Sequence, residues 1–358
     1  MKARNKKTGE CVALKKVRSD SDSAGANGFP LTALREIMLL RSLDHPNIIK
    51  LRDVKLSTPE SDSKLPSIYL ALELCSNDLE TIIQSGAWRW WTQSHVKCLA
   101  KQLLEGLAVL HASKILHRDV KSSNLLLSES GELKITDLGL ARLMKDGSSS
   151  ATTQLTNRVV TIWYRAPELL LGSTHYTESV DIWAAGCVII ELLTGKPLFP
   201  GQNEAQELQL IFGLLGTPTD QTWCASLPLW DSVKQHFGPK ASRLNEWFQK
   251  NNIIDPLVRD ILGKMICLDP RQRMKAKDLL LECNWFWTNP VPCKPCDLPK
   301  YTGLRSKLQQ QQAKKTMMQQ QQQQPHPQQK PQPQQRALVQ QPQPGPSYVR
   351  QAVVAPQQ

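Results

Sequence analysis

The sequence contains no apolar run long enough to cross a bilayer. The longest such run, WAAGCVIIELL (183–193), is too short to span the hydrocarbon core and carries the charged Glu191. The N-terminus is basic and has no apolar stretch of the kind that forms a secretory signal. These absences predict an intracellular protein that does not cross a membrane.

The sequence also lacks a disulfide framework and a complete zinc-binding pattern. Its nine cysteines are scattered singly and are odd in number, and the CxxC of Cys293 and Cys296 has no second pair. Cysteines in this arrangement are usually small buried hydrophobic residues in a reducing compartment. We therefore expect free thiols and no structural zinc.

A nucleic-acid-binding signature is missing as well, although the formal net charge is +12. The basic residues are spread along the chain, without an aromatic-interleaved stripe, a zinc finger or a helix-turn-helix signature. The charge pattern therefore favours a generally basic surface over direct recognition of nucleic acid.

The C-terminal stretch 306–358 has almost no aromatic residues. It is dominated by Gln and Pro, and Tyr348 is its single aromatic residue. Such a segment buries too little apolar surface to offset the entropy lost on ordering, so we expect a disordered tail. Composition leaves open whether this tail recruits other factors or has no function.

Hydrophobic periodicity divides the rest of the chain into a strand-rich part and a helical part. Short apolar runs predict strands, and longer segments with helical spacing or continuous apolar character predict helices. The strands are expected at 11–17, 48–56 and 67–74, and the helices at 29–43, 96–113 and 180–195. A small strand-rich lobe followed by a larger helical lobe is an α+β, two-lobed layout.

The strongest chemical signal is ILHRDVKSSNLLL, followed by ITDLGLAR. Phosphoryl transfer from a nucleotide needs a carboxylate to accept the proton of the attacking hydroxyl, two oxygen ligands for Mg²⁺, and a cation near the transferred group. A polar turn between two strands would explain HRD alone, but not HRDxKxxN followed by DxG and APE. The spacing brings together the polar side chains of Asp119, Lys121, Asn124 and Asp137.

With these motifs the chain resembles the eukaryotic protein kinases, and more narrowly the cyclin-dependent kinases, from Lys2 to about Trp287. The resemblance implies ATP as phosphate donor and Mg²⁺ as cofactor. It implies that Asp119 acts as base and Lys121 contacts the phosphate. It also implies that Asn124 and Asp137 bind the metal.

Two N-terminal motifs extend this resemblance. VALKK (12–16) is similar to the strand whose lysine, here Lys15, holds the α- and β-phosphates. PLTALRE (30–36) is similar to the cyclin-binding helix, in which Glu36 would pair with that lysine. The resemblance therefore implies a cyclin partner bound through this helix.

The same resemblance implies an adenine pocket at IYLALELCSNDL (68–79). A buried strand that runs into a turn looks similar on its own, so the assignment depends on the position of the segment between the helix and the catalytic loop. Leu72 would lie at the back of the pocket, the backbone of Glu73 and Cys75 would hydrogen-bond adenine, and Asp78 would lie near the ribose. The resemblance also assigns Ala13 and Leu126 to the ATP-binding site.

Three arginines indicate how the protein is regulated. In the family, the counterparts of Arg35, Arg118 and Arg142 converge on one phosphorylated threonine, and the matching position is Thr156 in QLTNRVVTIWYRAPE. Guanidinium groups form charge-assisted hydrogen bonds with phosphate, so an activating kinase acting on Thr156 is implied. Three unrelated surface arginines are the alternative.

The segment RVVTIWYRAPE (158–168) resembles the family's substrate-positioning segment, which favours proline directly after the acceptor Ser or Thr. By the same resemblance, Glu168 would pair with Arg273 inside the helical lobe. Asp181 would brace the catalytic loop, although a simple helix N-cap would also explain an Asp at that position.

The sequence departs from the family pattern at two places. DLG replaces DFG, so Leu138 offers less packing area than a ring while Asp137 keeps its carboxylate. The family's glycine-rich loop, GxGxxG, would precede the lysine strand, and it is absent before Lys15. An incomplete chain and a naturally shortened cyclin-binding form are both consistent with this absence.

Two functions therefore stay open. The first is an active cyclin-dependent kinase acting on Ser/Thr-Pro sites, and the second is a catalytically impaired scaffold that binds a cyclin. The retained catalytic residues favour the first, and the missing glycine loop favours the second.

Within the family, TNRVVT (156–161) and PCKPCDLPKY (292–301) look most like the transcription branch, whose members phosphorylate the C-terminal domain of RNA polymerase II in the nucleus. A cell-cycle-type kinase is the alternative. The expected boundaries are an N-lobe at 1–75, a C-lobe at 76–290, a C-terminal extension at 291–305 and the tail at 306–358.

Overall fold

The structure is a computed structural model, which describes residues 1–17, 31–57, 67–144, 161–218, 223–301 and 303–304. Several predictions lie outside the described residues. They concern the tail 306–358, the phosphorylation site Thr156, the first residues of the branch motif and of the substrate-positioning segment (156–160), and the first two residues of the helix predicted at 29–43. The described residues all belong to one compact unit, Met1–Gln311.

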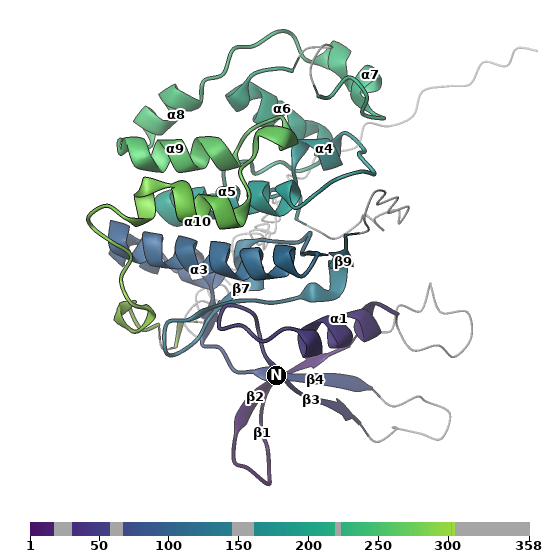
Figure 1. Cartoon of the computed structure of the whole chain (residues 1–358), viewed down its shortest axis with the longest axis vertical. Coiled ribbons are helices and arrows are strands. Elements are labelled where there is room, and N and C mark those ends of the chain that lie inside the picture. Colours follow the sequence, from purple (N-terminus) through teal and green to yellow (C-terminus); the bar gives the residue numbers. More distant parts are fainter. Residues whose placement is uncertain (18–30, 58–66, 145–160, 219–222, 302, 305–358) are drawn as a thin grey trace, which may run out of the picture. The chain divides into compact units, whose positions relative to one another are not determined.

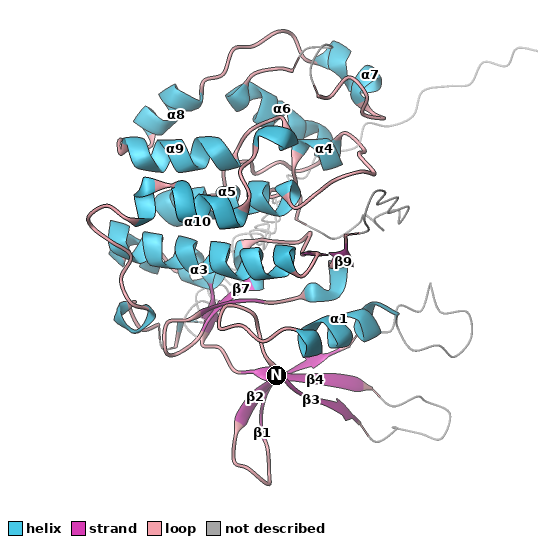
Figure 2. Ribbon diagram, in the orientation of Figure 1, coloured by secondary structure: helices cyan, strands magenta, loops and turns pink. Residues whose placement is uncertain are grey.

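Among the described residues, the N-terminal part forms a four-stranded antiparallel sheet (Figures 1 and 2). The register places Ala13 opposite Leu72, and Lys15 opposite Leu70. The spatial order of the strands is β1 (Lys2–Arg4), β2 (Cys11–Lys16), β4 (Ile68–Glu73) and β3 (Leu51–Leu56).

The predicted strand 48–56 is shorter in the structure, where β3 begins at Leu51. Its first residues turn to the other lobe instead, and the Ile49 N–H donates to the Ile135 carbonyl at 2.9 Å. An apolar run does not by itself show which of two sheets takes each residue, which is why the sequence overestimated this strand.

Helix α1 (Leu31–Ser42) contacts β3 and the segment after Asp137. Its inner face buries Ala33, Ile37 and Leu40, which follow the helical period. On another face, Leu34 is 41% exposed and Met38 69% exposed. The described chain therefore leaves an apolar stripe of α1 uncovered.

The second lobe is mainly helical and stacks its helices in layers (Figure 2). Short 3-10 turns join several of its elements. The α-helices are α2 (Leu79–Gln84), α3 (Gln93–Ala112), α4 (Pro167–Leu170), α5 (Ser179–Thr194), α6 (Glu204–Leu215), α7 (Trp230–Val233), α8 (Leu244–Lys250), α9 (Pro256–Met265) and α10 (Ala276–Glu282). This arrangement confirms the α+β, two-lobed prediction.

Helix α5 is the centre of this lobe. It is buried along nearly its whole length, as its apolar composition predicts, and Trp183 stacks on Phe199 with ring centroids 5.8 Å apart. A Cβ atom on Gly186 would lie 2.8 Å from the Ile266 side chain, so glycine is what lets α5 and the end of α9 approach. A rigid central helix gives the catalytic loop a fixed support.

Short ladders between the lobes carry the segments expected to hold the chemistry. The first ladder pairs β5 (Asn77–Asp78), β7 (Leu125–Leu127) and β8 (Leu133–Ile135). The second pairs β6 (Ile115–Leu116) with β9 (Arg142–Leu143). The 3-10 helices η2 (Ser122–Asn124) and η3 (Leu138–Leu140) lie beside them.

Two sequence expectations concern membranes and cysteines. No helix within the described parts of the chain is long and apolar enough to span a membrane. All nine cysteines are free thiols. Burial raises the pKa of the Cys75 and Cys98 thiols to about 12, which keeps these two groups protonated and unreactive near neutral pH.

Candidate active site

The loop after β6 is held by one buried carboxylate of α5. The Asp181 side chain accepts the backbone N–H groups of His117 at 2.9 Å and Arg118 at 2.8 Å, and it lies 3.0 Å from the His111 ring. Burial by itself would raise the pKa of Asp181, but the His111 contact and the nearby donors hold it below its usual value. Asp181 therefore braces the loop as an ionised acceptor, as the resemblance implied.

This brace holds Arg118 in a left-handed backbone conformation, with φ of 70°. Non-glycine residues rarely adopt that region, and the strain persists only where surrounding contacts impose it. The two backbone N–H groups that donate to Asp181 supply those contacts, and Asp119 is the next residue along the loop.

Asp119 lies at the centre of a small polar cluster. Its Oδ2 contacts the Lys121 ammonium group at 2.8 Å and accepts a hydrogen bond from the Asn124 amide nitrogen at 2.8 Å. Its Oδ1 accepts no hydrogen bond from the described residues. One carboxylate oxygen is therefore anchored, and the other is available to a substrate proton.

A second cluster joins both lobes through Lys15. Its ammonium group lies 2.8 Å from Glu36 Oε1 and 2.7 Å from Asp137 Oδ1. Burial would lower the pKa of Lys15, but the charges of Glu36 and Asp137 outweigh burial and raise it. Burial would likewise raise the pKa of Asp137, and Lys15 lowers it instead. Lys15 and Asp137 are therefore both charged near neutral pH.

The predicted adenine-pocket residues lie on β2, β4 and β7 and on the segment that follows β4. Ala13 and Leu72 pair across the sheet, and Leu126 pairs with Asp78. In the described chain the Cys75 N–H has no hydrogen-bond partner. A free backbone donor at this position suits a planar ring with a nitrogen acceptor.

Two residues predicted near adenine and ribose also have structural partners. The Glu73 carboxylate accepts the Lys50 N–H at 2.8 Å and lies 3.4 Å from the Lys134 ammonium group. Asp78 is buried, and its Oδ1 caps α2 by accepting the Thr81 N–H at 2.7 Å. These contacts fix the segment that joins the lobes.

Arg35, Arg118 and Arg142 lie close together. Burial lowers the pKa of Arg142, and the charges of Arg35 and Arg118 lower it further. The Arg118 guanidinium lies over the Tyr176 ring at 5.5 Å, and its Nη1 is buried without a partner among the described residues. Three cations with an unpartnered donor form a site for an anion.

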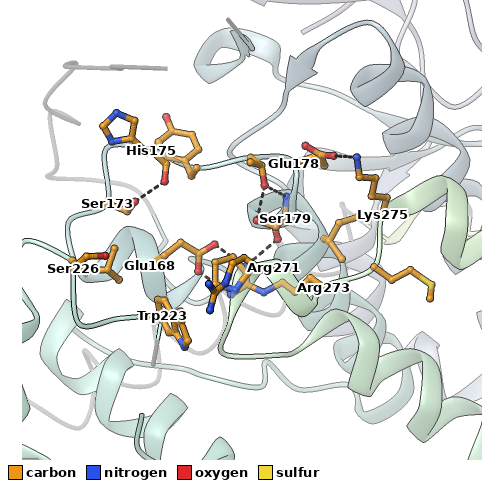
Figure 3. A pocket seen from close by; sticks show the side chains of 16 residues that line it. Glu168, Ser173, His175, Glu178, Ser179, Trp223, Ser226, Arg271, Arg273 and Lys275 are labelled. Carbon is orange, nitrogen blue, oxygen red and sulfur yellow. Dashed lines mark hydrogen bonds and ion pairs between the residues drawn. The ribbon is translucent and has the colours of Figure 1, made fainter. Parts of the chain in front are cut away.

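The predicted ion pair of Glu168 and Arg273 is buried behind this region. Two parallel bonds of 2.7 and 2.8 Å join the carboxylate to the guanidinium. Figure 3 shows the pair at the wall of a pocket lined by the loop before α5. Arg273 also donates to the carbonyls of Ser179, Cys267 and Leu268, so all of its nitrogens have partners.

Leu138, the departure from DFG, is completely buried. Its turn, η3, packs against α1, so the two elements are in contact with a leucine at this position. The leucine is smaller than a phenylalanine ring, but its side chain is not exposed at this position.

Sequence reasoning missed a buried network beside Asp119. The Tyr164 hydroxyl lies 2.7 Å from Glu191 Oε2 and 3.0 Å from the Ser122 hydroxyl. It links the catalytic loop, the substrate-positioning segment and α5. Glu191 was the available signal, because an acidic residue inside an apolar buried helix needs a polar partner.

A second missed contact ties the substrate-positioning segment to α6. The Trp163 ring N–H donates to the Gly201 carbonyl at 2.9 Å, and the Gly201 N–H donates to Glu207 at 2.9 Å. Arg165 pairs with Glu204 at 2.8 Å. No motif signals these pairs, since they join segments that are far apart in the sequence.

Comparison with known proteins agrees with this geometry. A family model described as "Protein kinase domain" matches residues 1–286. Cyclin-dependent kinase C-1 of Oryza sativa subsp. japonica is 43% identical over 311 residues, which cover 84% of this chain and 58% of that protein. CTD kinase subunit alpha of Schizosaccharomyces pombe is 38% identical over 301 residues, covering 84% and 48%.

A solved structure is also similar. A chain in the crystal structure of the yeast RNA Pol II CTD kinase CTDK-1 complex superposes with a TM-score of 0.71 at 36% identity. The match covers 82% of the present chain and 91% of that one. In contrast, the chain spans only about two-fifths to three-fifths of the length of the curated relatives it matches.

Proposed function

The chain belongs to the protein kinase family, among the cyclin-dependent kinases, and on this premise we propose that it transfers the γ-phosphate of ATP to Ser or Thr residues followed by Pro. One observation carries the proposal. Lys15 on β2 and Glu36 on α1 form one cluster with Asp137, and this cluster lies close to the cluster of Asp119, Lys121 and Asn124, since the Lys121 charge acts on Asp137. Phosphoryl transfer needs both sets of groups.

Protein kinases use ATP and Mg²⁺, and the donor set of this site fits them. The Asn124 amide nitrogen donates to Asp119, which leaves the amide oxygen without a partner in the described chain. Asp137 contacts Lys15 through Oδ1 only. Asn124 and Asp137 thus each offer one free oxygen, the ligand type that Mg²⁺ prefers. The bound metal would neutralise charge on the phosphates.

Catalysis would proceed from Asp119. Its free Oδ1 would accept the proton of the substrate hydroxyl, while Lys121 and Asn124 hold the carboxylate in place. Lys121 would also supply positive charge near the transferred phosphoryl group. Lys15, held by Glu36, would contact the α- and β-phosphates, and Ala13, Leu72 and Leu126 would enclose adenine.

A cyclin is the expected partner, and α1 is its expected contact. Leu34 and Met38 expose an apolar stripe on this helix. A partner that covers the stripe would also hold Glu36 against Lys15, because the stripe and Glu36 lie on the same short helix, α1. Phosphate on Thr156, added by an activating kinase, would neutralise Arg35, Arg118 and Arg142.

The RNA polymerase II C-terminal domain is the proposed substrate, and the nucleus is the proposed location. The support is the similarity to CTD kinase subunit alpha and to the CTDK-1 structure. The resemblance of the substrate-positioning segment implies a preference for proline directly after the acceptor Ser or Thr, and this preference fits Ser-Pro repeats.

The test is phosphate transfer from labelled ATP by the full chain, purified with a cyclin of the transcription branch. A peptide of Ser-Pro repeats should be labelled, and the same peptide with Ala in place of Pro should not. Asp119→Asn should reduce kcat by about a hundredfold or more without abolishing ATP binding. Equal labelling of both peptides would contradict the proline requirement.

A thermal shift with Mg²⁺-ATP separates an active site from a scaffold without any cyclin. Ligand at a hundred times its dissociation constant should add about 2.7 kcal/mol to the free energy of unfolding. The increase should disappear in Lys15→Met and Asp137→Asn. A cooperative transition that ATP does not shift would support the cyclin-binding scaffold instead.

A further inference from the structure

A groove lies between α6 and α8, outside the site already described. It has a volume of about 720 Å³. Its floor is apolar, and the Leu210, Leu214 and Trp247 side chains line it. We call it the α6–α8 groove.

The rim of the α6–α8 groove is cationic. Lys240, Arg243 and Lys250 line it together with a single acid, Glu246. Both lysines are exposed, and neither forms an ion pair within the described chain. The pocket of Figure 3 differs in this respect, since its Lys275 is paired with Glu178 at 3.1 Å.

The backbone holds this rim in place. The Arg243 N–H donates to the Leu214 carbonyl at 2.8 Å, and the Thr217 N–H donates to the Lys240 carbonyl at 3.0 Å. The Arg243 side chain donates to the Gly213 carbonyl at 3.0 and 3.2 Å. The cations therefore belong to a built surface, and an incoming ligand need not order the backbone that carries them.

The groove begins next to the substrate-positioning segment. Glu204, in the first turn of α6, pairs with Arg165, and the loop before α6 binds Trp163. The helix has 12 residues, so it is about 18 Å long at 1.5 Å per residue. An extended peptide covers that length with about six residues.

We propose that the α6–α8 groove docks an acidic segment with bulky apolar side chains, located about six or more residues from the phosphorylated Ser or Thr of the protein substrate. This inference rests on the proposed kinase activity. Carboxylates of the segment meet Lys240 and Lys250, and its apolar side chains cover Leu210, Leu214 and Trp247. The leucines of the floor and the acidic Glu246 on the rim disfavour a nucleic acid.

Binding can be measured on the full chain without a cyclin. The probe is a fluorescein-labelled peptide that alternates Asp or Glu with Leu or Phe, followed by anisotropy. Lys240→Glu combined with Lys250→Glu should weaken binding about tenfold or more. The matched control combines Lys277→Glu with Lys300→Glu, two exposed lysines outside the groove, and should change binding less than twofold.

Three results would overturn the proposal. They are equal loss in both double variants, equal binding of a peptide with Ser in place of Leu and Phe, and absence of saturable binding. Displacement of the peptide by a single-stranded oligonucleotide at lower concentration would assign the groove to nucleic acid instead.

Kinetics separate this docking from the kinase activity. With the cyclin complex, a Ser-Pro peptide extended by the acidic segment should have a KM about tenfold below that of the unextended peptide. Lys240→Glu with Lys250→Glu should remove this difference in KM. The double variant should leave kcat and the KM of the unextended peptide unchanged. Equal KM values in the unmodified chain would reject docking while leaving the kinase activity intact. Binding without any phosphate transfer would reject the kinase activity alone.

Discussion

Arg273 and Arg118 lie in the same lobe, but their guanidinium groups differ in whether every buried nitrogen has a hydrogen-bond partner among the described residues. Arg273 is buried, pairs with Glu168 through two bonds and gives its remaining hydrogens to carbonyls. Arg118 has a buried Nη1 that no described residue accepts. A fully partnered buried charge is part of the architecture, whereas an unpartnered one indicates a ligand that completes it.

The largest expected effect comes from breaking the buried pair of Glu168 and Arg273 by removing one partner. Arg273→Met leaves the Glu168 carboxylate buried without its partner, and should lower the free energy of unfolding by about 3–5 kcal/mol. Chemical denaturation followed by tryptophan fluorescence measures this. Arg271→Met, at an exposed arginine two positions earlier, should leave the unfolding midpoint nearly unchanged, because its ion pair with Asp269 is screened by solvent. Equal losses would contradict the comparison.

Glu207 extends the comparison to an acid, because its Oε1 is also buried without a partner in the described chain. Burial raises the pKa of Glu207 from 4.5 to about 8, although the Gly201 N–H opposes the rise. The folded protein therefore favours the neutral acid. The contribution of Glu207 to the free energy of unfolding is therefore complete below pH 4.5, and it is lost as pH rises through about 8.

Glu207→Gln should remove this pH dependence, which amounts to about 1.4 kcal/mol per pH unit inside that window. Unfolding curves at several pH values and constant ionic strength test it. The exposed Glu282→Gln is the control and should leave the slope unchanged. A variant that keeps the slope would show that another group titrates.

A smaller effect is expected at Arg118, and it depends on phosphate. Phosphorylation of Thr156 should stabilise the unmodified chain by about 2 kcal/mol, because charge-assisted hydrogen bonds replace repulsion among three arginines. Arg118→Met should remove most of this gain and cost little in the unphosphorylated protein. Thermal unfolding of both forms measures the difference. A large loss of stability in the unphosphorylated Arg118→Met variant would mean that Arg118 stabilises the fold itself, as Arg273 does.

The smallest expected effect is at the network that links the catalytic loop to the substrate segment. Tyr164→Phe removes a hydroxyl shared by Ser122 and Glu191, and should cost about 1 kcal/mol of unfolding free energy. The KM for the peptide substrate should rise while that for ATP stays unchanged. Tyr69→Phe is the matched control, since the Tyr69 hydroxyl has no hydrogen bond to another described residue. A change in the KM for ATP would point to a different role.

In the helical lobe, the local sequence predicted which segments form helices better than it predicted where each helix begins. The apolar run of α5 predicted a buried central helix, and the structure has one. The helix predicted at 96–113 begins earlier, at Gln93, because Thr92 caps it by accepting the His95 N–H. A cap depends on one side chain and one backbone angle, so hydrophobic periodicity does not locate it.

The sequence by itself identified the groups of the candidate site, because phosphoryl transfer requires certain residue types in one order and spacing. Lys15, Glu36, Asp119 and Asp137 could be named from motifs alone. Tertiary structure decided which polar groups have partners. Burial and distance decide whether every nitrogen of an arginine has a hydrogen-bond partner, as in Arg273, or one of them lacks a partner among the described residues, as in Arg118. These quantities depend on segments far apart in the chain, and no short motif contains them.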